Sequence, residues 1–213
     1  MNILCYGDSN TWGYVPNCHG YAKDAVAQRY AAPDCWWYPL TEIDHALKIN
    51  GLCGRSIAHE NPWLANRNAS ATIGEDLRHY PNLDLMIVQL GTNDCKSMYH
   101  DSPATITKNL DRLLKMIRQQ TAAQIMLISP AQINENTPIT QKYYQGAQSK
   151  TIALDRSYQD LAARHNLLFV SGLALSVGED GEHLTKQGHR QLGQMVIAKV
   201  KDINKDYTPE LGR

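Results

Sequence analysis

This 213-residue chain lacks an excess of positive or negative charge, because its 21 Lys and Arg residues balance its 21 Asp and Glu residues. Nucleic acids and anionic membrane surfaces are bound through a basic excess or a basic face. Long apolar runs are missing too, and none approaches the roughly 20 residues that a transmembrane helix needs. The sequence therefore predicts neither a nucleic-acid partner nor a membrane partner.

The sequence also lacks a recognisable signal peptide and any cysteine pair spaced for a metal. Its first apolar run, Ile3 to Tyr6, is too short for the h-region of a signal peptide. The 5 cysteines are scattered and include no CxxC pair, which excludes a zinc ribbon and disfavours a full disulfide framework. They are Cys5, Cys18, Cys35, Cys53 and Cys95. We expect free thiols and a cytoplasmic location.

Apolar residues make up 43% of the chain, which is enough for one large core. Short apolar runs that end in turn residues are typical of strands buried on both faces of a parallel sheet. Such runs cover residues 3–6, 85–90, 125–128 and 167–170, with a weaker candidate at 46–49. Helical spacing of apolar residues follows at 104–120, 150–165 and 185–204. This alternation predicts one doubly wound α/β domain, with its functional crevice beyond the carboxyl ends of the strands.

A serine follows the first predicted strand directly, in the turn Gly7-Asp8-Ser9. A hydroxyl on a tight turn at the edge of a sheet suits a nucleophile, provided that a base reaches it. The alternative is that Asp8 or Ser9 only caps a helix.

The candidate base is His183, three residues after Asp180. A carboxylate at this spacing can fix the tautomer of the imidazole while the other ring nitrogen faces the serine. The alternative is a helix start with His183 on the surface. From the residues alone, Glu179 and Glu182 compete with Asp180 as the carboxylate partner of His183.

Two further turns could supply donors to an oxyanion. Asn93 follows the most apolar strand, and an asparagine side chain can donate to developing negative charge. Gly54 would let a backbone N–H approach a substrate closely. The alternatives are an Asx-turn at Asn93 and an ordinary turn at Gly54.

Two rival functions stay open on these residues alone. A non-catalytic domain with the same kind of sheet could bind a sugar or a phosphate at the strand ends. A metallohydrolase could use Asp8, Asp94, Asp180, His183 and His189, although the H-E-x-x-H spacing is absent.

Taken together and in this order, Gly7-Asp8-Ser9, the glycine turn, Gly91-Thr92-Asn93-Asp94 and Asp180-x-x-His183 resemble the SGNH hydrolases, also called the GDSL esterase/lipase family. The resemblance runs from Met1 to Gly193. It implies a single catalytic domain over residues 1–213, built as a three-layer α/β/α sandwich around a flavodoxin-like, mainly five-stranded parallel sheet. It also implies a serine esterase without a cofactor or a metal.

Carried over by position, the resemblance makes Ser9 the nucleophile, His183 the base and Asp180 its orienting carboxylate. The oxyanion donors would be the backbone N–H groups of Ser9 and Gly54 and the side chain of Asn93. One departure is Asn10, because the name-giving motif has a leucine there. This difference concerns the shape of the substrate site.

Within the family, Thr11-Trp12-Gly13 and the Gly51 to Arg55 turn look closest to small arylesterases and acyltransferases, some of which form homo-oligomers. We therefore expect hydrolysis of short-chain, acetyl-type esters, with carbohydrate esters as one candidate class and with Asp8 and Trp12 as substrate contacts. Thioesterase, lysophospholipase and acyltransferase activities are the alternatives inside the family.

The aromatic residues near the first two loops have two interpretations. Trp36, Trp37 and Trp63 could wall a sugar or acyl pocket, or they could pack into the core or a subunit contact. The segment 134–146, which contains Tyr143 and Tyr144, could form a flap, a subunit contact or a plain surface loop.

Overall fold

A computed structural model of the chain describes residues 1–17, 27–42 and 46–206, with side chains up to residue 202. Cys18 lies outside the described residues, and the other four cysteines are free thiols. Five parallel strands form one sheet in the order β2-β1-β3-β4-β5. They are β1 Asn2–Gly7, β2 Ala46–Gly51, β3 Leu85–Gln89, β4 Gln124–Ile128 and β5 Leu168–Val170. The predicted doubly wound, five-stranded parallel sheet is confirmed, including the weaker strand at 46–49.

The first strand lies inside the sheet, because β1 pairs with β2 on one side and with β3 on the other. Cys5, for example, is in register with Ile49 and with Ile87. All four strand pairs are parallel, so the carboxyl ends of the strands meet at one edge. The turn that carries Ser9 therefore emerges beside the turns that follow β2 and β3.

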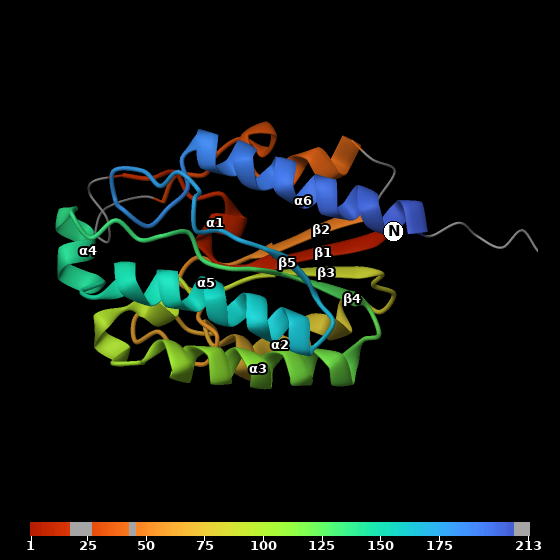
Figure 1. Cartoon of the computed structure of the whole chain (residues 1–213), viewed down its shortest axis with the longest axis horizontal. Coiled ribbons are helices and arrows are strands. Elements are labelled where there is room, and N and C mark those ends of the chain that lie inside the picture. The colour runs from red at the N-terminus through yellow and green to blue at the C-terminus, as the bar shows by residue number, and fades with distance from the viewer. Residues whose placement is uncertain (18–26, 43–45, 207–213) are drawn as a thin grey trace, which may run out of the picture.

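Helices cover both faces of the sheet (Figure 1). The helices α2 Ala69–Arg78, α3 Pro103–Gln120 and α5 Ala147–Arg164 lie on one face and pack on Leu4, Met86 and Leu127. The helix α6 Lys186–Asp206 lies on the other face, together with the short 3-10 turns η1 Ala32–Asp34 and η2 Tyr38–Glu42. This arrangement is the predicted three-layer sandwich.

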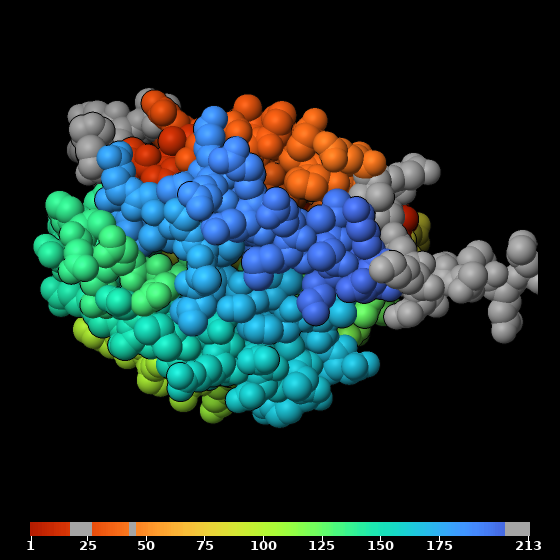
Figure 2. All heavy atoms as spheres, turned by 45° about the horizontal axis from the view of Figure 1, so that its top comes forward, coloured from red at the N-terminus to blue at the C-terminus, as the bar shows by residue number. Residues whose placement is uncertain are grey.

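The layer that contains α6 buries the two neighbouring tryptophans. Trp36 and Trp37 pack with Leu192 and Val196 of α6 against Ile87 of the sheet. Figure 2 shows α6 beside the orange segment that contains η1 and η2. Trp36 is 1% exposed and Trp37 is 7% exposed, so both belong to the core and not to the wall of a pocket.

Two helices differ from the sequence-based expectation. No helix was predicted at α2, whose buried residues Ala69, Ile73 and Leu77 recur every four positions behind the capping residue Asn68. The segment 134–146 contains the helix α4 Pro138–Tyr143, which Thr137 caps, so a plain surface loop is wrong. The three predicted helices exist, and their ends lie within three residues of the predicted ones. Among the described residues, no helix has the length and the apolar character needed to cross a bilayer.

Candidate active site

The turn after β1 places Ser9 at the start of a four-residue helix, α1 Ser9–Trp12. Asp8 caps this helix, because its side chain accepts a hydrogen bond of 2.9 Å from the backbone N–H of Asn10. Gly7 is required here, since a Cβ atom would lie 2.2 Å from Oγ1 of Thr11. The capping interpretation of Asp8 is thus correct, and it leaves the hydroxyl of Ser9 available. Asp8 is fully buried beneath the turn, and its role as a substrate contact stays a prediction.

His183 lies between Ser9 and Asp180, although 174 residues separate it from Ser9. Its Nε2 atom is 2.8 Å from Oγ of Ser9, and its Nδ1 atom is 2.8 Å from Oδ2 of Asp180. With the proton on Nδ1, the imidazole donates to the carboxylate and accepts from the serine hydroxyl. All three residues are at least 94% buried, since His183, the most exposed, is 6% exposed. The structure thus brings the predicted serine, histidine and aspartate into one chain of hydrogen bonds.

Asp180 is held in its ionised form by its neighbours. Burial alone would raise the pKa of its carboxyl group, but the hydrogen bond and the charge of His183 lower that pKa below its usual value. The Oδ1 atom accepts two further bonds, from the backbone N–H groups of Glu182 at 3.1 Å and His183 at 3.0 Å. An ionised Asp180 can stabilise an imidazolium as it forms.

The pKa of His183 is raised above its ordinary value. Burial acts to lower it, but the negative charge of Glu182 and the hydrogen bond and charge of Asp180 outweigh burial. The ring of Tyr14 also stacks on the imidazole, with centroids 4.2 Å apart and an angle of 24° between the planes. A raised pKa makes the imidazole a stronger base, which favours proton transfer from the serine hydroxyl.

The competing carboxylate Glu182 points elsewhere. Its Oε2 atom accepts a short hydrogen bond from the hydroxyl of Tyr144, and Glu179 lies exposed on the loop. Glu182 therefore contributes negative charge near His183, whereas Asp180 is the carboxylate that bonds to the imidazole. The sequence did not reveal the roles of Tyr14 and Tyr144, because neither belongs to a spacing motif.

The two predicted oxyanion donors lie on neighbouring turns after β2 and β3. Gly54 adopts a φ of +81°, in the region that favours glycine. The Nδ2 atom of Asn93 donates a hydrogen bond of 3.0 Å to the carbonyl oxygen of Arg55, the residue after Gly54. The amide nitrogen of Asn93 carries two hydrogens. This bond orients the side chain and leaves its second N–H for another acceptor. The Asx-turn interpretation of Asn93 does not hold, because its side chain bonds across to another turn.

The other predicted aromatic residues lie in different surroundings. Trp12 is half-buried, and the guanidinium carbon of Arg29 lies 5.3 Å from its ring centroid. Trp63 is 72% exposed, and it is followed by Leu64, whose Cδ1 would lie 3.5 Å from a Cβ at Gly54. The loop with Trp63 therefore borders the Gly54 turn. Trp12 as a substrate contact stays a prediction.

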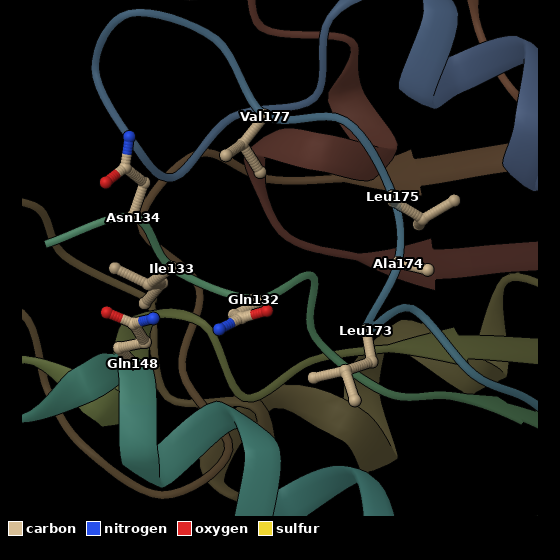
Figure 3. A pocket seen from close by; sticks show the side chains of 8 residues that line it. All are labelled: Gln132, Ile133, Asn134, Gln148, Leu173, Ala174, Leu175 and Val177. Carbon is tan, nitrogen blue, oxygen red and sulfur yellow. The ribbon is translucent and has the colours of Figure 1, made fainter.

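A separate depression of about 360 Å³ lies at the same edge of the sheet (Figure 3). Its lining side chains come from the segment after β4, from the segment after β5 and from Gln148 of α5. None of its lining residues is one of the predicted site residues.

The residues of the rival metallohydrolase do not converge. Nδ1 of the buried His189 accepts a hydrogen bond of 3.3 Å from the backbone N–H of Trp36, and both oxygens of Asp94 accept from the N–H of Ile57. Asp180 and His183 bond to each other. Within the described part of the chain, no three His, Cys, Asp or Glu side chains are grouped to hold a metal ion.

The GDSL-like Lipase/Acylhydrolase family matches residues 5–191, which is most of the chain. The chain belongs to this family. A search of curated protein sequences gives no match.

Several solved structures are similar to this chain over most of its length. An aryl esterase from M. smegmatis is 28% identical, with a TM-score of 0.86 over 95% of this chain and 99% of that chain. Est24, a carbohydrate acetylesterase from Sinorhizobium meliloti, is 25% identical, with a TM-score of 0.85 over 95% of this chain and 99% of that chain. A lipase/acylhydrolase from Enterococcus faecalis, at 20% identity and a TM-score of 0.68, shares the fold. This GDSL-family chain is therefore a carboxylic ester hydrolase with the SGNH hydrolase fold.

Proposed function

We propose that the chain is a serine esterase that forms an acyl-enzyme on Ser9 and acts on short-chain, acetyl-type esters, including those of carbohydrates. The observation that carries the proposal is the pair of 2.8 Å contacts that join Ser9, His183 and Asp180. Such an arrangement activates a hydroxyl that is a weak nucleophile at its own pKa.

The reaction runs in two steps. Oγ of Ser9 attacks the ester carbonyl while Nε2 of His183 takes the hydroxyl proton, and the C–O bond of the leaving alcohol then breaks as His183 returns that proton to it. His183 then deprotonates a water molecule that attacks the acyl carbon, and the bond from that carbon to Oγ of Ser9 breaks. His183 returns the proton to Oγ as the acid leaves. The backbone N–H groups of Ser9 and Gly54 and the side chain of Asn93 stabilise the oxyanion in both steps, at about 3–4 kcal/mol per donor.

The choice of a short acyl group is supported by the relatives. The similar structures are described as an aryl esterase and a carbohydrate acetylesterase. The ring of Tyr14 stacks on the imidazole of His183, and the sequence contains no long apolar insertion that could serve as a lid or a lipid-binding surface. A homo-oligomeric state and a cytoplasmic location stay predictions, the first of which sedimentation of the purified protein would test.

The experiment is turnover of p-nitrophenyl acetate by Ser9→Ala and His183→Ala. We expect kcat to fall by at least about 10³-fold in each variant. Ser157→Ala is the matched control, because its hydroxyl bonds within α5 to the carbonyl of Ala153 and should leave kcat unchanged. Near-wild-type turnover by Ser9→Ala would refute the proposal.

A profile over acetyl, butyryl and octanoyl esters and acetylated sugars tests the substrate class. We expect kcat/KM to be highest for acetyl esters, and a maximum at octanoyl esters would indicate a lysophospholipase or thioesterase instead. Activity should also survive EDTA, since His189 and Asp94 are engaged in structural hydrogen bonds.

A further inference from the structure

Asn10, the residue next to Ser9, makes two hydrogen bonds to the segment that carries His183. Its Oδ1 atom accepts a bond of 2.8 Å from the backbone N–H of Leu184, and its Nδ2 atom donates a bond of 3.3 Å to the carbonyl oxygen of Glu182. One side-chain amide therefore holds the backbone on both sides of His183. Asn10 is 2% exposed, so these bonds form out of contact with water.

The two bonds join segments that are more than 170 residues apart in sequence. The aspartate end of the same loop is held differently. Thr137 donates to the carbonyl oxygen of Asp180 at 3.0 Å, and the N–H of Asn134 donates to that of Gly181 at 2.9 Å. The segment before α4 thus holds Asp180, while Asn10 holds His183.

The backbone of Asn10 is itself fixed relative to Ser9. It is the second residue of α1, and its N–H is bonded to the capping carboxylate of Asp8. Any displacement of the histidine segment relative to Asn10 therefore changes the separation of Nε2 of His183 from Oγ of Ser9. A misplacement of about 1 Å at reacting groups can lower a rate about 100-fold.

An asparagine is suited to this place because it carries a donor and an acceptor on one planar group. Leucine, the residue of the name-giving motif, has a similar size and neither function. In an Asn10→Leu variant, the N–H of Leu184 and the carbonyl of Glu182 would lose these partners in a buried site, which is unfavourable.

We propose that Asn10 is a positioning residue that sets the distance between the nucleophile and the general base by bonding the backbone on both sides of His183. The proposal rests on the proposed function of Ser9 and His183. Asn10, the residue after the nucleophile, thereby takes part in the geometry of proton transfer.

The test compares Asn10→Leu and Asn10→Asp with Thr11→Val, using p-nitrophenyl acetate on the pH-independent plateau of the rate. Thr11→Val is the matched control, because it removes a buried bond of 2.8 Å from the same turn, to Gln89, without touching the histidine segment. We expect kcat of Asn10→Leu to fall at least about tenfold with KM within about twofold. Asn10→Asp keeps an acceptor for Leu184 and should retain more kcat than Asn10→Leu.

Thr11→Val should keep kcat within about twofold even where its melting temperature falls as much as that of Asn10→Leu. A wild-type kcat in Asn10→Leu, or an equal loss in Thr11→Val, would overturn the positioning role. Should Asn10→Leu fail to fold, the comparison of Asn10→Asp with Thr11→Val decides by the same criterion. Ser9→Ala measured in parallel separates the two proposals, because activity in that variant refutes the proposed function itself.

Discussion

The carboxylates around the imidazole of His183 favour its protonated form. Asp180 bonds to Nδ1, and the carboxylate of Glu182 adds negative charge from the neighbouring position. The two carboxylates nevertheless differ, because Asp180 fixes the ring while Glu182 bonds to Tyr144. Their variants should therefore separate an effect on the pKa from an effect on orientation.

The pH dependence of kcat/KM should report His183. The base must be neutral to accept a proton, so kcat/KM should rise with pH through the pKa of His183, with a midpoint above the ordinary value of 6.5. Removing either negative charge by Asp180→Asn or Glu182→Gln should move this midpoint to lower pH. The measurement is kcat/KM for p-nitrophenyl acetate from pH 5 to about 9.

The plateau of these profiles distinguishes the two carboxylates. Asp180→Asn should lower it by about 10²-fold to 10⁴-fold because the tautomer is no longer fixed, whereas Glu182→Gln should lower it by less than about tenfold. Equal plateaus would mean that Asp180 is not the orienting carboxylate.

At the scale of single residues, the sequence predicted which side chains meet better than how they are held. Ser9, Asp180 and His183 follow motif spacing, and they do lie together. Glu182 remained a competitor because the direction of a side chain on a loop depends on packing, here against Tyr144. Tyr14 and Asn10 act through contacts across more than 160 residues, which no local pattern contains.

Arg55 connects the ends of two strands to the oxyanion turns. Its guanidinium donates to the carbonyl oxygens of Gly7 at 2.9 Å and Asn50 at 2.6 Å, and it lies 4.0 Å from the ring centroid of Tyr6. Its own carbonyl oxygen accepts from Asn93. The position of one buried side chain thus links the ends of β1 and β2 to the turn after β3.

Arg55→Lys should therefore weaken both stability and catalysis, because the ammonium group of lysine cannot form the several planar hydrogen bonds that the guanidinium forms. We expect the free energy of unfolding to fall by about 1–3 kcal/mol and kcat to fall at least about threefold. Urea unfolding and turnover of p-nitrophenyl acetate measure the two effects. Arg78→Lys is the control, because Arg78 forms an exposed ion pair with Glu75 on α2. It should change neither the free energy of unfolding nor kcat. Unchanged kcat in Arg55→Lys would show that the guanidinium of Arg55 does not position the oxyanion turns.

Elements with continuous apolar runs were predictable, and those with sparse patterns were not. Four of the five strands are apolar runs that end in turn residues, and β2, which Lys48 interrupts, was the weaker candidate. The helix α2 escaped because only three of its ten residues are buried and one of these is an alanine, so that its cap at Asn68 is its clearest signal. The helix α4 is six residues long, too short for its apolar spacing to be recognised.

Across the whole molecule, folding buries the carboxyl groups of Asp8 and Asp94 completely. Burial raises the pKa of Asp8 to about 6 and that of Asp94 to about 7. A raised pKa stabilises the folded chain only while the group is protonated. For Asp94 this contribution is complete below the ordinary value of 3.8 and is lost as pH rises through about 7.

The wild-type chain should accordingly lose stability relative to Asp94→Asn as the pH rises. We expect the difference in free energy of unfolding to change by about 1 kcal/mol or more between pH 4 and about 8. Urea titrations at three pH values measure it, and Asp160→Asn on the exposed face of α5 is the control. A constant difference between wild type and Asp94→Asn would contradict the account of Asp94.

The three layers were predictable at this scale because alternating strands and helices admit few arrangements. The packing of the η1 and η2 segment beside α6 was not, because these short turns have no periodic pattern. That packing decides the role of Trp36 and Trp37, which fill the core where the sequence left them as candidates for a substrate wall.

The most direct measurement of the central claim is mass spectrometry of the chain after reaction with a fluorophosphonate. A serine activated by His183 should be phosphonylated once, on the peptide that contains Ser9, and Ser9→Ala should remain unlabelled. His183→Ala should be labelled at least about 100-fold more slowly. Labelling of another serine, or equal labelling of Ser9→Ala, would contradict the account.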